Sequence, residues 1–480
     1  MQPDADDHQF FRSSAPIERT HQRFLLRELH FTQQFASMYA ARINQLLRRA
    51  VQSALHHCDG APPLFSRILD LNPNTRCVIA GTLFKHLPHY AGFLSEYQKE
   101  LVRIDAGCAD EDGDDAAINE LPELTEKVVA STSSWCTAED TVILEDDSGR
   151  VELSRLTVDV HGLVSGMVVA AVGHLREKGL FAVEKLYFAE LPQQMPRRLS
   201  TTVVVSQSTA SCSDTKYIAF VCGLSLDCRG TPTRPLALML EFLEGLLGTE
   251  EVTAMAQRVT RLVIGGNTLA VTDEQRLKAK VRLEPSDHQQ LSNTSNTAGS
   301  SMKYMDQLLA AMAEMVEVDV MPGDTDPSNA YLPQQPLHPL LLKQASRKGT
   351  LRLVTNPYEF NVPESGTEFF VSSGQPVDDI LRQSRYTSVC EVCAVLLRCG
   401  CCCPTAPNTL VCYPFKGVDP FVFPSVPHCF VSCNAPQFET RFEQSIANGV
   451  RLVAVPSFSS SGLLVLVDVV SLETQCISFV

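Results

Sequence analysis

Nine short, nearly continuous apolar runs follow one another from residue 200 to the C-terminus, and they restrict the possible folds more than any other feature of the chain. Helix candidates lie between several of them, at 235–248 and 302–315. Apolar strands that alternate with helices are typical of a sheet covered on both faces. The second half of the chain is therefore predicted to be an α/β domain, with a polar loop or linker at 284–301. The nine runs read STTVVVSQ, KYIAFVCGLSL, RVTRLVIGGN, VDVMPGD, LRLVTNP, TEFFVSSG, CFVSCN, RLVAVPSF and LLVLVDVV.

A second pattern, of strands without intervening helices, precedes these runs. Residues 76–87 are a strand-like run, 141–154 read as a hairpin about a polar turn, and 164–175 and 179–191 give two more strands. Five strands with no sustained helix among them predict a small β-barrel of the OB type. Residues 105–126 are acidic and poor in apolar side chains, so we expect a long surface loop there.

The N-terminal segment 17–52 has helical spacing and contains six arginines against two glutamates. Its apolar residues recur at intervals of about four, which predicts an amphipathic helix whose stripe is interrupted by Arg42. A charged face on a packing helix is the favoured interpretation, and contact with DNA phosphates is the alternative. The predicted stripe consists of Phe31, Phe35, Met38, Tyr39, Ile43, Leu46 and Leu47.

The length of the chain predicts how many domains it forms, and its composition argues against some classes of function. A chain of 480 residues is expected to form two or more domains, which we place at 1–60 (helical), 61–195 (OB fold) and 196–480 (α/β). The net charge of −15 argues against nucleic-acid binding by the whole surface. Seventeen scattered cysteines and an acidic N-terminus without signal-peptide character favour reduced thiols in the nucleus or cytosol. No apolar run is long enough to predict a transmembrane helix.

The predicted barrel can be compared with barrels that bind single strands, which stack bases on aromatic side chains in a positive groove. The hairpin 141–154 has no aromatic residue, and four carboxylates outnumber Arg150. This charge pattern favours a protein-binding barrel. The four carboxylates are Glu145, Asp146, Asp147 and Glu152.

The loops that follow the predicted strands are the candidate site, because ligands of open α/β folds bind at the carboxyl ends of strands. Their order and spacing resemble those of the calcineurin-like metallophosphoesterases. The resemblance implies two metal ions held by the pattern D-x-H, G-D-x-x-D, G-N-H-[DE], a lone His and G-H-x-H. In this chain the matching positions are Gly223 and Ser225, Asn267, Asp324 and Thr325, Ser373, then Asn434 and Pro436.

A count of histidines supports the loss of such a site. A two-metal centre needs a dense set of carboxylates and imidazoles, yet His288, His338 and His428 are the histidines beyond residue 200. We therefore expect no catalytic residue, no bound metal and no cofactor. Asp324 and Asp326 are interpreted as turn residues whose carboxylates bind nearby backbone N–H groups.

Several longer strings resemble the B-subunit family of replicative DNA polymerases, and within it the small regulatory subunits of eukaryotic DNA polymerase delta. The resemblance covers the chain from about residue 25 to its end and is strongest at VDVMPGDTDPSN and LPQQPLHP. It implies an OB-type barrel packed on an inactive phosphodiesterase-like α/β/β/α domain. Further strings that support it are FTQQFASMYAARI, CVIAGTLFK, LVTNPYEF, SSGQPVDDILR, PTAPNTLVCYPF and DPFVFPSVPH.

This resemblance implies a nuclear scaffold subunit, not an enzyme, that links the C-terminal metal-binding domain of the catalytic subunit to a third accessory subunit. DNA contact would be weak or indirect, and no membrane is involved. Two alternatives stay open. One is a divergent phosphodiesterase that uses Asn267, Asp324 and Asp326, and the other is a single-strand binder that uses the barrel and the basic N-terminal segment.

The cysteine run from Cys390 to Cys403 departs from the family pattern. Cys390-x-x-Cys393 followed by four more cysteines could form a zinc site, but structural zinc sites use two separated pairs. VCEVCAVLLRCG reads as a helix with Leu396 and Leu397 inward. Reduced, buried or partly exposed thiols are the favoured interpretation.

Overall fold

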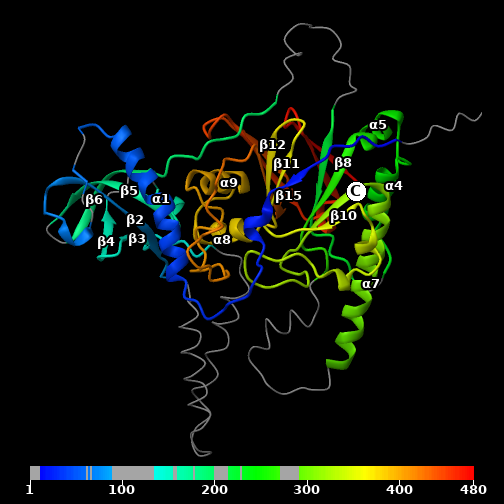
Figure 1. Cartoon of the computed structure of the whole chain (residues 1–480), viewed down its shortest axis with the longest axis horizontal. Coiled ribbons are helices and arrows are strands. Elements are labelled where there is room, and N and C mark those ends of the chain that lie inside the picture. Colours follow the sequence, from blue (N-terminus) through cyan, green and yellow to red (C-terminus); the bar gives the residue numbers. More distant parts are fainter. Residues whose placement is uncertain are drawn as a thin grey trace, which may run out of the picture. The chain divides into compact units, whose positions relative to one another are not determined.

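The computed structural model describes residues 11–60, 63–64, 67–88, 134–154, 159–176, 179–198, 215–227, 230–270 and 291–480, with side chains from 299 onward in the last range (Figure 1). The chain divides into two compact units. The sheet unit comprises residues 1–41, 191–377 and 388–480, and the barrel unit comprises 42–190 and 378–387. The acidic segment 105–126 and the run STTVVVSQ lie outside the described residues.

The barrel unit is built on five strands that close in the order β2-β3-β4-β6-β5. Neighbours are antiparallel except β4 and β6, which pair in parallel and complete the barrel. The close approach of β2 to β3 requires a glycine, since a Cβ on Gly81 would lie 2.2 Å from the carbonyl oxygen of Glu145. All predicted strands of this region are confirmed. They are β2 (Arg76–His86), β3 (Thr141–Glu145), β4 (Arg150–Ser154), β5 (Val168–Leu175) and β6 (Leu180–Phe188).

The predicted hairpin turn between β3 and β4 is held by one side chain. Asp146 accepts hydrogen bonds from the N–H groups of Ser148 (2.7 Å) and Gly149 (2.8 Å), and from that of Ile68 (2.7 Å). Partial burial raises the pKa of Asp146, but these hydrogen bonds outweigh it and leave the pKa below its ordinary value. The turn carboxylate is therefore a structural group.

The N-terminal helix is shorter than predicted. Helix α1 runs from Ala36 to His57, whereas residues 18–19 form strand β1 (Glu18–Arg19) and 21–24 form a 3₁₀ turn. The predicted stripe is wrong at its start, where Phe31 is 57% exposed. Tertiary contacts of residues 12–30 override the helical spacing there. The buried face of α1 consists of Met38, Ala41, Arg42, Leu46, Ala50 and Ala54.

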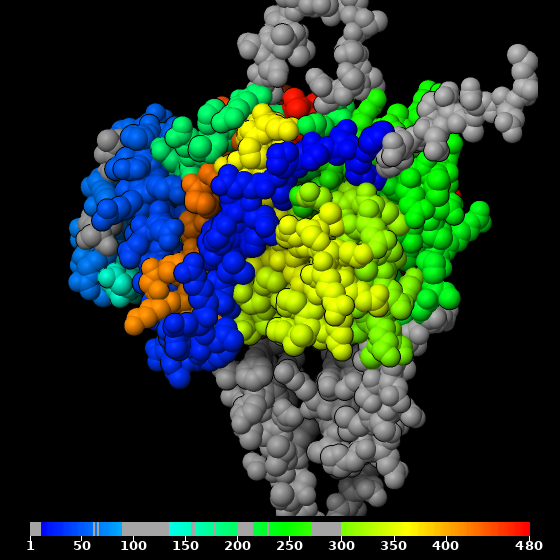
Figure 2. Space-filling model, turned by 45° about the vertical axis from the view of Figure 1, so that its right-hand side comes forward, coloured from blue at the N-terminus to red at the C-terminus, as the bar shows by residue number. Residues whose placement is uncertain are grey.

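Those contacts hold the N-terminal segment across one face of the sheet unit, where Figure 2 shows it in dark blue. Arg12 donates to the carbonyl oxygens of Ala256 (2.6 Å), Val259 and Met315 (both 2.9 Å). Strand β1 pairs with β11, and the Arg23 guanidinium forms a two-pronged ion pair with Glu359 at 2.9 and 2.5 Å.

The sheet unit contains two six-stranded sheets, in the orders β1-β11-β12-β13-β15-β14 and β10-β9-β8-β7-β16-β17. Their strands, after β1, are β7 (Tyr217–Val221), β8 (Val259–Gly265), β9 (Glu317–Met321), β10 (Leu351–Leu353), β11 (Tyr358–Val362), β12 (Thr367–Ser372), β13 (Cys429–Ala435), β14 (Glu439–Glu443), β15 (Val450–Pro456), β16 (Leu463–Asp468) and β17 (Thr474–Ser478). Eight of the nine predicted runs form strands, while β1, β11, β14 and β17 were not predicted.

The two sheets pack face to face on a shared core that includes Phe220, Phe360, Phe369, Val431 and Val465. The second sheet buries its other face under α4 (Arg234–Glu244), α5 (Glu250–Arg258) and α7 (Leu291–Met315). Helix α9 (Val389–Arg398) packs on β13, β14 and β15 of the first sheet. Two shorter helices are α8 (Gln375–Gln383) and α10 (Phe458–Ser461). Two sheets between layers of helices agree with the α/β/β/α arrangement that the family resemblance implies. The apolar runs by themselves indicated a sheet covered on both faces, and one face of each sheet is here covered by the other sheet.

Helix α7 corrects one further prediction. Residues 284–301 were expected to form a polar loop, but α7 begins at Leu291 and includes 291–301. Its apolar residues Met305, Leu309 and Met312 are buried. Because adding residues to an existing helix costs little, the packed part of α7 continues toward its N-terminus through the polar residues. None of the helices in the described ranges combines the length and hydropathy that a bilayer span requires.

Candidate functional site

The strand-end loops singled out from the sequence come together in the sheet unit. Strands β7, β8 and β9 are parallel in one sheet, and β12, β13 and β15 are parallel in the other. Gly223 donates its N–H to the carbonyl oxygen of Gly266 at 2.9 Å, which links the first two loops. We call these loops the strand-end cluster; they comprise residues 223–226, 266–269, 323–326, 373–374 and 433–436.

The cluster is closely packed. A Cβ on Gly266 would lie 2.4 Å from the Ser373 hydroxyl oxygen and 2.8 Å from the Cα of Gly323. A Cβ on Gly323 would in turn lie 2.4 Å from the backbone nitrogen of Asn267. These glycines allow backbones to touch, so side chains and backbone fill the space between the loops.

Three non-glycine residues of the cluster have left-handed backbone conformations. The φ angles are 50° at Ser225, 53° at Asn267 and 57° at Asn434. This region is uncommon for side-chain-bearing residues and concentrates at functional sites. All three positions are among those that the expected resemblance to metallophosphoesterases assigns to metal ligands.

Asp326 is the buried carboxylate of the cluster, 5% exposed. Its Oδ1 accepts from the N–H groups of Thr268 (2.9 Å) and Leu269 (3.1 Å), and its Oδ2 accepts from that of Gly323 (2.9 Å). Burial raises the pKa of Asp326 to about 6, although these hydrogen bonds act in the opposite direction. Both oxygens are thus occupied by backbone donors, as the interpretation of a turn residue requires.

Asp324 differs from Asp326 in being exposed. Its Oδ1 accepts a hydrogen bond, at 3.0 Å, from the side-chain amide of Gln375. The prediction that this carboxylate binds nearby backbone N–H groups is therefore wrong for Asp324, whose exposed side chain pairs with another side chain. Thr325, between the two aspartates, donates its hydroxyl to the carbonyl oxygen of Leu269 at 2.6 Å and its N–H to Asn267 Oδ1 at 3.3 Å. The loop 323–326 is therefore anchored to the neighbouring loop 267–269.

An amide network lines one side of the cluster and was missed in the sequence. Gln334 Oε1 accepts from Asn356 Nδ2 (2.8 Å) and Gln375 Nε2 (3.0 Å), and Gln334 Nε2 donates to the carbonyl oxygen of Gly323 (3.1 Å). Asn356 Oδ1 accepts from the N–H of Ser373 at 3.0 Å. Gln334 and Asn356 are buried. Asn and Gln have no spacing signature, so only the string LPQQP could have drawn attention to them.

Asn434 connects the two sheets. Its Nδ2 donates to the carbonyl oxygens of Ser373 (2.9 Å), which follows β12 of one sheet, and Gly265 (3.2 Å), which ends β8 of the other. Its backbone N–H contacts the Cys222 sulfur at 3.0 Å. This side chain acts as a cross-link at the position that the resemblance assigns to an imidazole ligand.

The described histidines beyond residue 200 lie outside the cluster. His428 precedes β13, at the opposite end of that strand from Asn434, where Nδ1 accepts from the N–H of Glu368 (3.0 Å) and Nε2 lies 2.9 Å from the carbonyl oxygen of Met195. His338 Nδ1 accepts from the N–H of Leu340 at 3.2 Å. Both imidazoles are hydrogen-bonded to backbone groups, and His288 lies outside the described residues.

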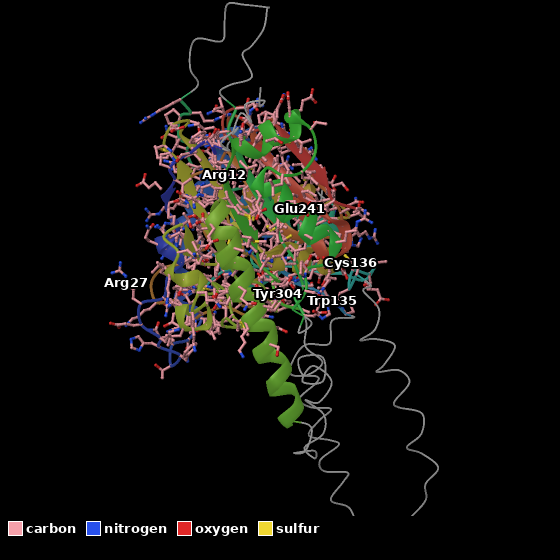
Figure 3. All side chains as sticks on the ribbon, turned by 90° about the vertical axis from the view of Figure 1, so that its right-hand side faces the viewer. Arg12, Arg27, Trp135, Cys136, Glu241 and Tyr304 are labelled. Carbon is pink, nitrogen blue, oxygen red and sulfur yellow. The ribbon has the colours of Figure 1, made fainter. Side chains whose placement is uncertain are left out.

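A hollow of about 260 Å³ beside the first loop of the cluster is lined by Leu224, Ser225, Asp227, Thr233 and Tyr304, among others. Tyr304 lies on α7 (Figure 3).

In the described parts of the chain, a single trio of side chains is arranged as metal ligands are, and it belongs to the barrel unit: Cys136, Asp140 and His161. Sequence reasoning missed it, because Cys-x₃-Asp and a distant His form no known spacing.

The cysteine run lies in and after α9. Cys390, Cys393, Leu396 and Leu397 are buried, which confirms the predicted inward face. The remaining cysteines of the run are also buried, and all are thiols. Burial raises the pKa of Cys390 to about 12 and that of Cys393 well above the ordinary value, so these thiols are protonated core residues.

Comparison with known proteins matches both units. A family model described as the DNA polymerase delta subunit OB-fold domain matches residues 34–186, and one that describes the B subunit of DNA polymerases alpha and epsilon matches 218–440. The DNA polymerase delta small subunit of Arabidopsis thaliana is 30% identical over 470 residues, which cover 98% of this chain and 96% of the relative. The chain belongs to the DNA polymerase delta small-subunit family.

Other members of the small-subunit family match over similar lengths. The DNA polymerase delta small subunit of Oryza sativa subsp. japonica is 28% identical and covers 98% of both chains. DNA polymerase delta subunit 2 of Drosophila melanogaster is 29% identical and covers 95% of both chains. The OB-fold match confirms the barrel prediction, and the match to the alpha and epsilon family model spans β7 to the start of β14, including the whole strand-end cluster.

Proposed function

We propose that this protein is a non-catalytic accessory subunit of a DNA polymerase delta complex, acting in DNA replication and repair. Near full-length similarity to delta small subunits of plants and of a fly supports this role. In this proposal the polymerase chemistry belongs to a catalytic subunit, and this chain supplies binding surfaces.

The proposal that this chain is not catalytic rests on one observation: polar side chains of the strand-end cluster are hydrogen-bonded to backbone groups. Asp326 binds three backbone N–H groups, and Asn434 joins two carbonyl oxygens from different sheets. Hydrolysis by a two-metal centre needs open carboxylate and imidazole ligands and a group that activates water. Side chains that are already hydrogen-bonded to buried backbone groups are poorly suited to bind metal ions or to activate water.

We infer that the sheet unit is a phosphoesterase-like domain of the calcineurin type whose metal ligands have been replaced. The proposal rests on the order of the strand-end loops and on the left-handed backbone at Ser225, Asn267 and Asn434. A metal cradle needs tight turns of this kind, and a scaffold does not. In this view the strained loops persist because their hydrogen bonds now hold the two sheets together.

The proposed partners are the C-terminal metal-binding domain of the catalytic subunit and a third accessory subunit, which this chain would connect in the nucleus. The proposed domains are a helical segment at 1–60, the OB-fold domain at 61–195 and the phosphoesterase-like domain at 196–480. The acidic hairpin face with Glu145 and Glu152 supports protein binding over single-strand binding by the barrel.

Co-expression with the C-terminal domain of a delta catalytic subunit tests the scaffold proposal. We expect the two chains to co-elute in size-exclusion chromatography at 0.15 M salt. The domain from an alpha or epsilon catalytic subunit serves as the matched control and should elute separately. Separate elution with the delta domain would refute the proposed partnership.

An assay with a nitrophenyl phosphodiester tests the non-catalytic proposal. We expect no turnover above buffer with Mn²⁺, and no difference between the protein and its Asp324→Ala variant. Metal-dependent turnover that Asp324→Ala abolishes would instead establish a divergent phosphodiesterase.

A further inference from the structure

The barrel unit contains a cluster of donor atoms that the proposed function does not use. Cys136 Sγ lies 2.9 Å from Asp140 Oδ2 and 3.2 Å from His161 Nδ1, and the latter two atoms are 3.6 Å apart. Donors on a tetrahedral Zn²⁺ are separated by roughly 3.3–3.6 Å, given metal–ligand bonds of about 2.0–2.3 Å. The three separations therefore lie within roughly 0.7 Å of those between corners of a zinc site, and Cys136 and Asp140 would move apart on metal binding.

A buried lysine balances the charge of this trio. Lys85 Nζ lies 3.2 Å from Cys136 Sγ, 3.4 Å from Asp140 Oδ2 and 2.7 Å from the carbonyl oxygen of Gln383. The side chains of Lys85 and Asp140 have no exposed surface. Burial raises the pKa of the Cys136 thiol, which donates to Asp140 Oδ2 in the metal-free cluster. A divalent cation would therefore bind with release of this proton, as metal binding by cysteine requires. Lys85 then acts as a donor to two ligands, the role of outer groups in metal sites.

The ligand atoms are held in place by further hydrogen bonds. Asp140 Oδ1 accepts from the N–H and the hydroxyl of Thr137, both at 3.0 Å, which turns Oδ2 toward Cys136. His161 lies on a 3₁₀ turn, where its N–H donates to Asp159 Oδ1 at 3.0 Å. Ligands oriented in this way lose little conformational freedom when a metal binds.

The cluster is partly exposed to solvent. The His161 side chain is 15% exposed, and Cys136 is also partly exposed, whereas Lys85 is enclosed. Cys136 follows Trp135, the single tryptophan of the sequence, in the segment just before β3 (Figure 3). A metal ion can therefore reach the trio from solvent and would lie close to a fluorescent side chain.

We propose that Cys136, Asp140 and His161 form a zinc site in the barrel unit, with water as the fourth ligand. A mixed sulfur, nitrogen and oxygen donor set suits Zn²⁺ better than Mg²⁺ or Ca²⁺, which prefer oxygen. The site joins the segment before β3 to the 3₁₀ turn at 160–162. The same segment is tied to residues 382–384 by the Trp135 N–H to Arg382 and the Ser134 hydroxyl to Ser384. Metal binding would therefore hold two separate chain segments together, one of which is already hydrogen-bonded to a third.

Titration of the reduced full-length protein with Co²⁺ tests the site. Co²⁺ replaces Zn²⁺ in such sites, and bound Co²⁺ absorbs in the near ultraviolet through its thiolate bond and quenches a nearby tryptophan. We expect one equivalent to quench Trp135 fluorescence and to produce the thiolate band, and we expect Zn²⁺ to reverse both signals. Absence of quenching at a tenfold excess of Co²⁺ would overturn the proposal.

Variants separate this site from other thiols. Cys136→Ser and His161→Gln should each weaken Co²⁺ binding at least tenfold. Cys476→Ser, which removes an exposed thiol on β17, should leave binding unchanged. Far-UV circular dichroism and Trp135 emission of the metal-free variants check folding. Unchanged Co²⁺ affinity in a folded His161→Gln variant would show that metal binds elsewhere, and would contradict the proposal without affecting the scaffold function.

Discussion

The strand-end cluster of the sheet unit and the Cys136 cluster of the barrel unit use polar side chains in opposite ways. In the first, the Asp326 carboxylate and the Asn434 amide nitrogen bind backbone groups in or next to the strand-end loops. In the second, Cys136, Asp140 and His161 direct theirs at one another. The difference teaches that a ligand-binding site needs donor atoms that point toward one place and are not already bound to backbone groups. That a loop lies where related folds bind metal does not by itself show that it binds metal.

The sharpest test of this comparison is Lys85→Met, because the Cys136 cluster depends on a buried ion pair and the strand-end cluster does not. The substitution leaves Asp140 buried without its ammonium partner, and we expect a loss of about 4 kcal/mol in the free energy of unfolding. Urea denaturation followed by Trp135 fluorescence measures it within the barrel unit. Lys185→Met, at an exposed lysine of β6, should change stability by less than about 0.5 kcal/mol.

A double variant, Lys85→Met with Asp140→Asn, completes that test. Removal of both charges should recover part of the loss, because the buried carboxylate is then absent. Equal losses in the single and double variants would mean that packing, and not charge, explains the effect.

Within the strand-end cluster, Asp326→Ala should have the largest effect. It leaves the buried N–H groups of Thr268, Leu269 and Gly323 without their acceptor, and we expect a loss of about 3 kcal/mol. Circular dichroism during urea unfolding measures it. Asp324→Ala, which removes one exposed hydrogen bond, should cost less than about 1 kcal/mol. If the two variants were equally stable, Asp326 would not be the anchor of the loop.

Asn434→Ala tests the link between the two sheets, with an expected loss of about 2 kcal/mol. The substitution removes the hydrogen bonds to Ser373 and Gly265 and leaves a side-chain-bearing residue at φ 57°. Asn434→Gly removes the same bonds but tolerates that φ, so it should be more stable than Asn434→Ala by several tenths of a kcal/mol. The reverse order would indicate that backbone strain is unimportant at this position.

The smallest expected effect is a pH dependence that originates at Asp326. Its pKa is about 6 in the folded protein and about 3.9 in an unfolded chain. The folded state therefore binds more protons between these values, and the contribution of Asp326 to stability decreases as pH rises through about 6. Between pH 5 and pH 7 the free energy of unfolding should fall by about 1 kcal/mol relative to Asp326→Asn, which does not titrate. A flat difference between the two proteins over this range would contradict the raised pKa.

Strand identities could be predicted where apolar runs are continuous. Runs such as KYIAFVCGLSL and RLVAVPSF correctly predicted β7 and β15. A strand that is buried on both faces is apolar at nearly every residue and is therefore visible as a continuous apolar run. Strands β14 and β17 were missed because they are edge strands with exposed residues, whose sequences ETRFE and TQCIS show no apolar run. The length of α1 was overestimated because the spacing of Phe31 and Phe35 says nothing about contacts made elsewhere in the chain.

The sequence by itself determined the barrel strands, the apolar strands of the sheet unit and the residues of the strand-end loops, because each depends on neighbours along the chain. It also determined the family, through strings such as VDVMPGDTDPSN that are local in sequence. Only the tertiary structure decided that Asp326 binds backbone from a loop about 60 residues away. It alone brought Lys85 and His161 to Cys136, because contacts between distant segments depend on packing, which no local pattern records.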